Sequence, residues 1–263
     1  MRILIILALA LLPVSAQAKT LCTALAEAAS GKMLMQDGDC ETRVTPASTF
    51  KIALAVMGYD SGFLKDEHTP LLPFQEGYPD WIKAWRTDTD PAAWMKKSVV
   101  WYSQRITENL GEERFGKYVE TLDYGNQDVS GDLGKDNGLE RSWIGSSLKI
   151  SPVEQVNFLR RLVRRELPVS PAAFDMTAKI TAQPPLPGGW ELHGKTGSAL
   201  LRKADGSQDR DRAYGWFVGW ATRGDKTIVF ARLIQTEKRE AIGSDLVARD
   251  AFLKELPELL PES

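Results

Sequence analysis

The sequence predicts a mixed α/β fold in which an antiparallel sheet is flanked by terminal helices and carries an inserted all-helical lobe. Strand-like patterns occur near residue 20 and again beyond residue 189, whereas the segments between them show helical periodicity and helix-capping residues. With 263 residues, the chain can bury a large core in one composite domain or in two lobes that share a cleft.

The first residues have the pattern of a secretory signal peptide. Arg2 is followed by an apolar run from Ile3 to Leu12, and small residues precede an expected cleavage site after Ala18. A membrane-spanning helix needs about 20 apolar residues, and neither this run nor any later segment reaches that length. We therefore expect residues 1–18 to be removed and residues 19–263 to be exported without a membrane anchor.

Bulk charge and histidine content exclude some classes of partner. The formal net charge is −2, and no basic patch indicates a nucleic acid or an acidic membrane surface as a partner. The chain has two histidines, His68 and His193, which are far apart in the sequence. We therefore expect no metal site.

Two short strands are predicted between residues 20 and 36, on either side of a hairpin turn at Ser30-Gly31. This hairpin would bring Cys22 opposite the neighbourhood of Cys40. In an oxidising compartment we expect these two cysteines to form a disulfide, and the alternative is a pair of free thiols.

An apolar helix is predicted over residues 47–60, with Thr45 as its N-cap, Pro46 as its first helical residue and Ser61-Gly62 at its end. A capping box of Ser151 and Glu154 is expected to begin a later helix. The predicted helices of the middle region are 92–110, closed by Gly111, then 112–122, 152–167 and 171–181.

Beyond residue 189 the pattern changes to strands, predicted at 190–196, 214–221 and 227–235. A turn over residues 222–225 joins the last two strands, which predicts antiparallel pairing. An amphipathic helix is predicted at 246–256, with Leu246, Phe252, Leu253 and Leu256 as its apolar residues. The helical lobe would then span residues 62–186, roughly.

A candidate acylation centre lies at the start of the first apolar helix. Ser48 and Lys51 are three residues apart, a spacing that puts a hydroxyl and an amine on one helical face. A buried lysine that is basic at neutral pH can take the proton of such a serine. Taken alone the spacing is a weak signal, because serine and lysine are common on helix surfaces.

Residues 189–196 fit the nucleotide-binding pattern G-x-x-x-x-G-K-[ST], but their context argues against a nucleotide site. A phosphate loop follows a buried strand and opens a helix. Here prolines between residues 184 and 187 precede the motif, strand-like sequence runs through it, and a charged loop follows.

The same residues have a different meaning beside Ser48 and Lys51. Lys195-Thr196-Gly197 matches the second element of the penicillin-recognising serine enzymes, and Ser98-Val99-Val100 and Tyr124-Gly125-Asn126 fall in the helical region between. With these motifs the chain closely resembles the class D serine β-lactamases, the oxacillinase type. The resemblance covers the mature chain in order, including Trp143 and the segment 214–220. The Glu-x-x-Leu-Asn element of class A relatives is absent.

The resemblance implies a β-lactamase/transpeptidase-like catalytic domain over residues 19–263, with the active site in the cleft between the sheet and the helical lobe. It implies a periplasmic hydrolase that opens the β-lactam ring of penicillin-type antibiotics and confers resistance to them. It also implies that Lys51 is carbamylated. Carbon dioxide or bicarbonate is needed for that modification, and no other cofactor is expected.

By this interpretation the carbamate on Lys51 deprotonates Ser48, and later activates the water that releases the acyl group. Phe50, Val99, Val100 and Trp143 would form the apolar pocket that disfavours the ammonium form, with the Trp143 indole as hydrogen-bond donor to the carbamate.

The remaining roles concern the lactam and its carboxylate. Backbone N–H groups of Ser48 and of Ser198, which follows Gly197, would form the oxyanion hole. Ser98 would relay a proton to the lactam nitrogen. Lys195 would add positive charge, and Thr196 and Arg249 would hold the substrate carboxylate.

Several alternatives stay open at this point. Arg239 and Arg232 compete with Arg249 as carboxylate binder, and Tyr124 and Asn126 are equally well explained as structural loop residues. A Ser-His-Asp triad through His193 lacks a nucleophile elbow. A β-lactam sensor domain without turnover, or a cell-wall transpeptidase, would normally bring membrane helices or further domains. We expect a monomer or a homodimer.

Overall fold

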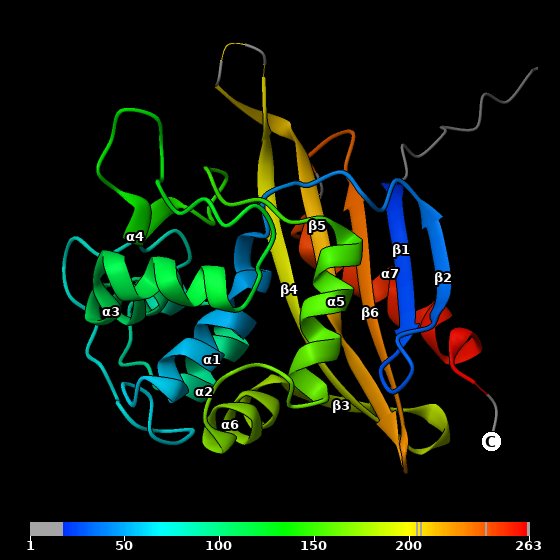
Figure 1. The fold of residues 1–263 in the computed structure, drawn as a ribbon. Helices are drawn as coiled ribbons and strands as arrows, with labels where there is room; N and C mark the ends of the chain where they lie inside the picture. Colours follow the sequence, from blue (N-terminus) through cyan, green and yellow to red (C-terminus); the bar gives the residue numbers. More distant parts are fainter. Residues whose placement is uncertain (1–17, 204, 206, 240, 262–263) are drawn as a thin grey trace, which may run out of the picture.

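The computed structural model describes residues 18–203, 205, 207–239 and 241–261, so the expected signal peptide lies outside the described residues except for Ala18. Six strands form one antiparallel sheet in the order β2-β1-β6-β5-β4-β3, with helices on both of its faces (Figure 1). The predicted fold class is confirmed. The strands are β1 (Lys19–Glu27), β2 (Met33–Gly38), β3 (Ala182–Leu186), β4 (Trp190–Arg202), β5 (Gln208–Arg223) and β6 (Lys226–Gln235).

The helices lie in two groups relative to the sheet. Helix α7 packs on one face, against β4, β5 and β6, whereas α5 packs on the other face against β1, β5 and β6. Helices α1, α2, α3 and α6 form a helical layer beside α5 (Figure 1). The helices are α1 (Lys51–Asp60), α2 (Pro91–Lys97), α3 (Val100–Thr121), α4 (Gly138–Arg141), α5 (Pro152–Val163), α6 (Pro171–Thr181) and α7 (Ser244–Leu259), with 3₁₀ turns η1 (Ala47–Phe50), η2 (Lys83–Trp85) and η3 (Pro187–Gly189).

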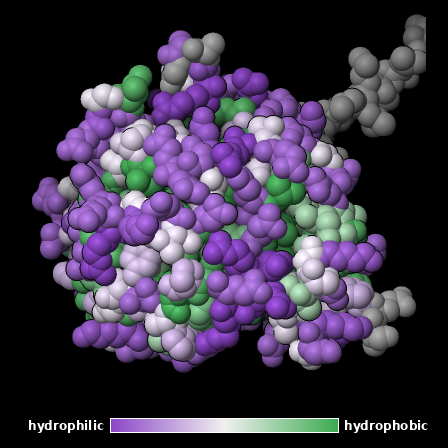
Figure 2. Space-filling model, viewed as in Figure 1, coloured by the Kyte–Doolittle hydropathy of each residue, from purple (hydrophilic) through white to green (hydrophobic). Residues whose placement is uncertain are grey.

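Two apolar cores follow from this arrangement. The larger core joins the sheet to α1, α3 and α5 and contains Phe50, Trp143 and Trp216. The smaller core lies under α7, where Phe217 and Phe230 contact Phe252. Hydrophilic residues cover most of the face seen in Figure 2, with apolar residues in small areas between them. None of the helices in the described part of the chain has the length and apolarity needed to cross a bilayer.

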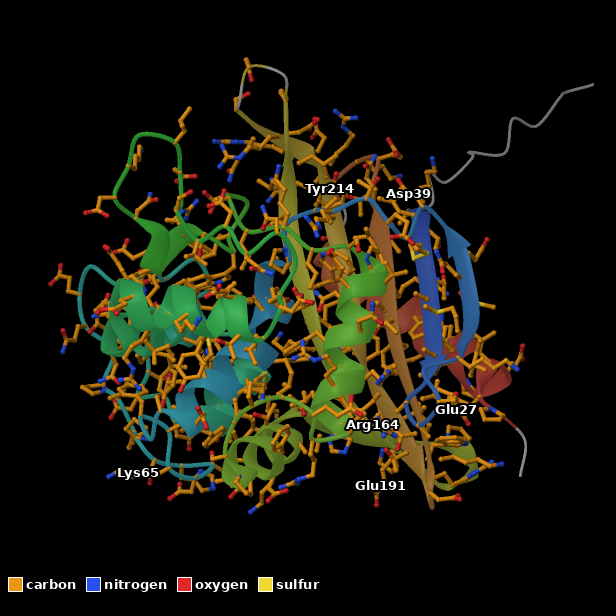
Figure 3. The ribbon with its side chains drawn as sticks, in the orientation of Figure 1. Glu27, Asp39, Lys65, Arg164, Glu191 and Tyr214 are labelled. Atoms are coloured by element: carbon orange, nitrogen blue, oxygen red, sulfur yellow. A yellow bond between two sulfur atoms is a disulfide. The ribbon has the colours of Figure 1, made fainter. Side chains whose placement is uncertain are left out.

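The predicted disulfide is present. Cys22 of β1 and Cys40, just beyond β2, are bonded with their Cα atoms 5.1 Å apart, next to Asp39 in Figure 3. The hairpin prediction is also confirmed, because β1 and β2 pair in an antiparallel register that sets Cys22 opposite Gly38.

The first predicted helix begins differently from the prediction. Residues Ala47–Phe50 form the 3₁₀ turn η1, and α1 starts only at Lys51. Thr45 is not an N-cap, because its hydroxyl donates instead to the carbonyl oxygen of Trp143, at 2.9 Å. The Thr45 hydroxyl is therefore not available to cap the helix locally, because it is bonded to a residue distant in the sequence.

The helix predicted over residues 92–110 is broken, which the sequence pattern did not indicate. Ser98 has a left-handed backbone with φ of 58°, and Val99 is extended, so α2 ends and α3 begins within three residues. No glycine or proline marks this break. The boundary predicted at Gly111 is confirmed, because its φ of 73° interrupts α3.

The remaining elements match the predictions more closely. The capping box of Ser151 and Glu154 begins α5, although that helix ends at Val163 rather than at residue 167. The bounds of α6 agree with those predicted. Strands β4 and β5 are longer than predicted, the antiparallel pairing of β5 with β6 is confirmed, and β3 was not foreseen.

Candidate active site

The structure brings Ser48 and Lys51 together at the junction of η1 and α1. The amine Nζ of Lys51 donates a hydrogen bond to the hydroxyl Oγ of Ser48, with the two atoms 3.2 Å apart. Lys51 has no exposed surface. Burial, together with repulsion from the nearby Lys195, holds the pKa of Lys51 well below its usual range. The environment therefore disfavours the ammonium form of the amine that lies beside the candidate nucleophile.

The turn that carries Ser48 contains a strained residue. Ala47 has a φ of 49°, in the left-handed region that alanine rarely adopts. Thr49 secures the turn, because its hydroxyl donates to the carbonyl of Pro46 at 2.7 Å and accepts from the Gln155 amide at 2.9 Å. Helix α5 thereby holds the Ser48 turn in a conformation that it would not adopt alone.

An aromatic wall covers the buried side of this pair. The Phe50 ring lies 5.6 Å from that of Trp143, 5.0 Å from that of Tyr124 and 6.1 Å from that of Phe115, measured between ring centres. All four rings are almost completely buried. They exclude water on the side of Phe50, the residue next to Lys51, which explains why the ammonium form of that lysine is disfavoured.

Tyr124 and Asn126 make structural contacts. The Tyr124 hydroxyl donates to the side-chain oxygen of Gln155 at 3.5 Å, and burial raises the pKa of this phenol. Asn126 joins two loops, because its amide donates to the carbonyl of Ser147 and its oxygen accepts from the backbone N–H of Lys149. Of the two explanations left open for these residues, the structure supports the structural one.

Strand β4 packs directly against the Ser48 turn. A Cβ atom on Gly197 would lie 2.9 Å from the carbonyl oxygen of Pro46 and 3.0 Å from the backbone nitrogen of Thr49. Only a glycine allows an approach this close without displacing backbone. The motif Lys195-Thr196-Gly197 is therefore held beside Ser48 by the packing of its third residue.

Lys195 is a second buried lysine, with 5% of its surface exposed. Its amine donates to the carbonyl oxygen of Thr196 at 2.9 Å. Burial lowers the pKa of Lys195 to about 8, with Asp245 opposing the shift and Arg249 adding to it. Lys195 therefore carries a charge that changes within the physiological range of pH.

His193 shares a sheet face with Lys195, because the pairing of β4 with β5 is regular from Glu191 to Leu200. Its ring stacks on Trp220 at 4.8 Å between ring centres, and its Nδ1 lies 2.9 Å from the carbonyl oxygen of Ala178 on α6. Burial lowers the pKa of His193. The ring is thus engaged by α6 and β5, and the structure gives no support to a triad through His193.

The arginines considered for carboxylate binding occupy three different places. Arg249 lines a cavity of about 690 Å³ together with Lys195 and Thr196, and its guanidinium pairs with Asp250. Arg239 lines another cavity, of about 450 Å³, with Ser198 and Ser244. Arg232 is buried, stacks over Phe252 and pairs with Glu255.

Two cavities are lined by successive segments of β4. The cavity of about 690 Å³ is lined by Gly194, Lys195 and Thr196, and another of about 530 Å³ by Ser198, Ala199 and Leu200. Trp81 and Ile144 form apolar walls of the second cavity. A small molecule lying along β4 across Gly197 would therefore pass beside Ser48.

Ser98, Val100 and Ser198 are the remaining predicted residues. Ser98 is half-buried at the break between α2 and α3, and Val100, the first residue of α3, is buried. The Ser244 hydroxyl donates to the carbonyl oxygen of Tyr214 and therefore accepts the hydrogen bond that joins it to the Ser198 hydroxyl at 2.7 Å. Ser244 was not predicted, because a lone serine in a polar segment carries no signal in the sequence.

Within the described residues, no three His, Cys, Asp or Glu side chains gather as metal ligands would.

Comparisons with known proteins identify the family of this chain. The family profile described as penicillin binding protein transpeptidase domain matches residues 15–258. The chain is 46% identical to β-lactamase OXA-9 of Klebsiella pneumoniae over 91% of this chain and 88% of that protein. The crystal structure of the OXA-427 class D β-lactamase superposes with a TM-score of 0.84 at 48% identity, covering 91% of this chain and 99% of that one.

A relative of another kind has the same fold. The C-terminal domain of the Bacillus licheniformis BlaR penicillin-receptor superposes with a TM-score of 0.75 at 27% identity, covering 91% of each chain. Identity to the OXA proteins is considerably higher and extends over nearly the whole of both chains. The chain therefore belongs to the class D serine β-lactamases of the oxacillinase type, hydrolases within the penicillin-binding transpeptidase superfamily.

Proposed function

We propose that the protein hydrolyses β-lactam antibiotics in the periplasm through an acyl-enzyme on Ser48, with a carbamylated Lys51 as the base in both halves of the reaction. The observation that carries this proposal is the fully buried Lys51 amine, 3.2 Å from the Ser48 hydroxyl. The names of the similar OXA proteins support a β-lactam substrate and resistance as the biological outcome.

The environment of Lys51 favours carbamate formation. A neutral amine attacks the carbon of CO₂, forms an N–C bond and loses one proton, which leaves an anionic carbamate. The depressed pKa of Lys51 favours the neutral amine that this reaction requires. Lys195, which repels an ammonium at Lys51, would attract a carbamate there. The indole of Trp143, packed on Phe50, is the proposed hydrogen-bond donor to that anion.

In the acylation step the carbamate takes the Ser48 proton, and Oγ forms a bond to the lactam carbonyl carbon. The C–N bond of the ring then breaks, and Ser98 relays a proton to the departing nitrogen. Backbone N–H groups of Ser48 and Ser198 stabilise the negative charge on the carbonyl oxygen. Gly197 supports this role, because its lack of a side chain lets β4 approach the Ser48 turn.

In the deacylation step the same carbamate takes a proton from water, whose oxygen attacks the ester carbon. The bond to Ser48 breaks, and its oxygen regains a proton from the carbamate. Thr196 and Arg249 would hold the substrate carboxylate, and Lys195 would add positive charge, since these three residues line one cavity. Val100, beside Ser98, would contribute to the apolar wall.

The test is hydrolysis of a chromogenic cephalosporin by the mature protein, with and without added bicarbonate. We expect turnover that rises with bicarbonate, and we expect Lys51→Ala to reduce kcat by a factor of 10² to 10⁴, roughly, the usual contribution of a general base. Intact-mass analysis should show that Lys51→Ala accumulates an adduct on Ser48 if acylation persists.

Other outcomes would point elsewhere. A stable adduct on wild-type Ser48 without turnover would identify a β-lactam sensor, the activity suggested by the BlaR likeness. A Lys51→Ala variant with a near wild-type rate would contradict the carbamate mechanism. Cleavage after Ala18 in the exported protein, measured by N-terminal sequencing, would support the periplasmic location.

A further inference from the structure

The loop that carries Trp143 is tied to the turn that carries Ser48 by one side chain, that of Thr45. The Thr45 hydroxyl donates to the carbonyl oxygen of Trp143 at 2.9 Å and accepts from the N–H of Gly145 at 3.0 Å. Thr45 is itself buried, and it lies three residues before Ser48. One hydroxyl therefore bonds to the peptide groups on both sides of Ile144.

The backbone of Thr45 is secured from the sheet. Its carbonyl oxygen accepts a hydrogen bond from the indole of Trp216 on β5, at 3.0 Å. Trp216 has no exposed surface. Because Thr45 is anchored by β5, its hydroxyl offers the Trp143 loop a fixed point rather than a mobile one.

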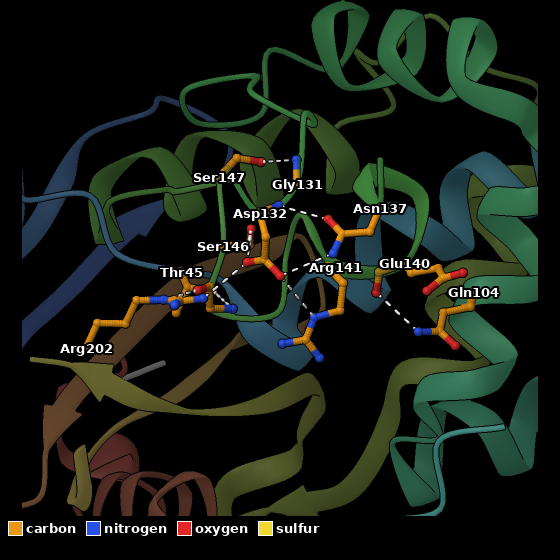
Figure 4. Close-up of polar contacts among 11 residues, drawn as sticks. Thr45, Gln104, Gly131, Asp132, Asn137, Glu140, Arg141, Ser146, Ser147 and Arg202 are labelled. Atoms are coloured by element: carbon orange, nitrogen blue, oxygen red, sulfur yellow. Dashed lines mark hydrogen bonds and ion pairs between the residues drawn. The ribbon is translucent and has the colours of Figure 1, made fainter. Parts of the chain in front are cut away.

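A second tie holds the same loop from the outside (Figure 4). Arg202, at the end of β4, donates from Nε to the carbonyl oxygen of Gly145 at 2.8 Å. The same guanidinium contacts the carboxylate of Asp132 at 3.2 Å, and that carboxylate accepts from Ser146 at 2.9 Å. Gly145 is thus bonded through its N–H to Thr45 and through its carbonyl to Arg202.

We propose that Thr45 is a positioning residue for the hydrolytic reaction: its hydroxyl holds the Trp143 loop against the Ser48 turn, and Arg202 with Asp132 closes the loop from the solvent side. This proposal rests on the proposed function, because the expected effect of losing the Thr45 hydroxyl is measured as a change at the carbamate on Lys51. When the Thr45 hydroxyl is removed, the Trp143 ring loses its fixed place on Phe50, and the carbamate loses its hydrogen-bond donor and part of its apolar cover.

The experiment compares Thr45→Val, which keeps the shape of the side chain without the hydroxyl, with Thr45→Ser, which keeps the hydroxyl. We expect Thr45→Val to require about tenfold more bicarbonate for half-maximal turnover, the fold-change that corresponds to one lost buried hydrogen bond. Deacylation should slow more than acylation, so the adduct on Ser48 should accumulate. Thr45→Ser should restore most of the wild-type bicarbonate response.

Arg202→Gln tests the outer tie independently of the buried one. We expect a change in the same direction but smaller, because the Arg202 side chain is 46% exposed and water can replace its hydrogen bonds. Arg165→Gln is the matched control. Arg165 has a similar exposure of 47% and pairs with Asp175 of α6, beyond the C-terminal end of α5, so its bicarbonate response should not change.

Each outcome has a defined meaning. A folded Thr45→Val variant with a wild-type bicarbonate response and a wild-type ratio of deacylation to acylation would overturn the proposal. If Thr45→Val does not fold, Arg202→Gln decides, because an unchanged response there would overturn the proposal as well. If wild-type turnover does not respond to bicarbonate, the carbamate mechanism is wrong. The role of Thr45 is then tested only by the ratio of deacylation to acylation in Thr45→Val.

Discussion

Lys195 is expected to lose its proton within the pH range of ordinary assays. Burial lowers its pKa to about 8 from the ordinary value of 10.5. Below pH 8 the ammonium attracts the substrate carboxylate, and above it that attraction disappears. We expect kcat/KM for acylation to fall as pH rises above 8, approaching about tenfold per pH unit if the charge is essential. The check is a pH profile from 6 to 10, and a flat profile to pH 10 would contradict the role of Lys195.

As pH rises, loss of the Lys195 proton is expected to lower kcat/KM but to raise the free energy of unfolding. The two effects can therefore be separated. A lysine whose folded pKa is depressed binds fewer protons in the folded state than in the unfolded state between pH 8 and pH 10.5. The contribution of Lys195 to the free energy of unfolding therefore rises with pH in this window. A fall in kcat/KM there is consequently not explained by this group unfolding the protein.

Trp143 contributes through both its ring and its N–H group, and two variants separate these contributions. We expect Trp143→Phe to slow deacylation by a factor of ten or more, roughly, since a hydrogen bond to a charged group is lost, while acylation changes less. Trp143→Ala also removes ring contacts with Phe50 and Phe115, so it should lower the Tm in addition. Rapid-quench measurement of both steps is the check, and equal losses in both steps would count against the proposed donor.

At the scale of elements, the contact between β4 and the Ser48 turn depends on Gly197. A Cβ there would meet backbone atoms of Pro46 and Thr49 at about 3 Å, so one of the two elements must move. We expect Gly197→Ala to lower kcat/KM by about tenfold or more and to destabilise the fold by about 1–3 kcal/mol, the usual cost of overpacking. Both quantities are accessible by steady-state kinetics and urea denaturation.

Gly116→Ala is the matched control for that variant. Gly116 lies in α3, where an added Cβ would meet only a Val129 methyl group, at 3.9 Å. Alanine is favoured over glycine inside helices, so stability should rise slightly and kcat/KM should stay unchanged. If both alanine variants behaved alike, close packing at Gly197 would not be the cause.

At the scale of the whole molecule, the disulfide and the active site are on different parts of the sheet. β1, which carries Cys22, is separated from β4 by β6 and β5. We expect the double variant Cys22→Ser/Cys40→Ser to lose about 3 kcal/mol of unfolding free energy, as for a closed loop of this size, with kcat almost unchanged. Urea denaturation with parallel activity assays provides the check. A large loss of kcat at full folding would show a coupling that the topology does not suggest.

Features that depend on neighbours in the chain were predicted correctly from the sequence. The capping box of Ser151 and Glu154, the bounds of α6 and the hairpin that pairs Cys22 with Cys40 are of this kind. Each rests on residues within a few positions of one another or on a single tight turn, so local preferences suffice. The ordered motifs around Ser48, Lys51 and Lys195 were recognisable for the same reason.

Other features depend on contacts between segments that are far apart in the chain. Thr45 was expected to cap a helix, but its hydroxyl bonds to Trp143, 98 residues away. The break at Ser98, the place of Arg249 beside Lys195 and the engagement of His193 by α6 likewise had no local signature. Local preferences amount to about 1 kcal/mol or less per residue, and burial and hydrogen bonding between distant segments outweigh them. The residues that carry the chemistry of the site could therefore be identified from the sequence. The geometry in which they act is set by the packing of the whole chain.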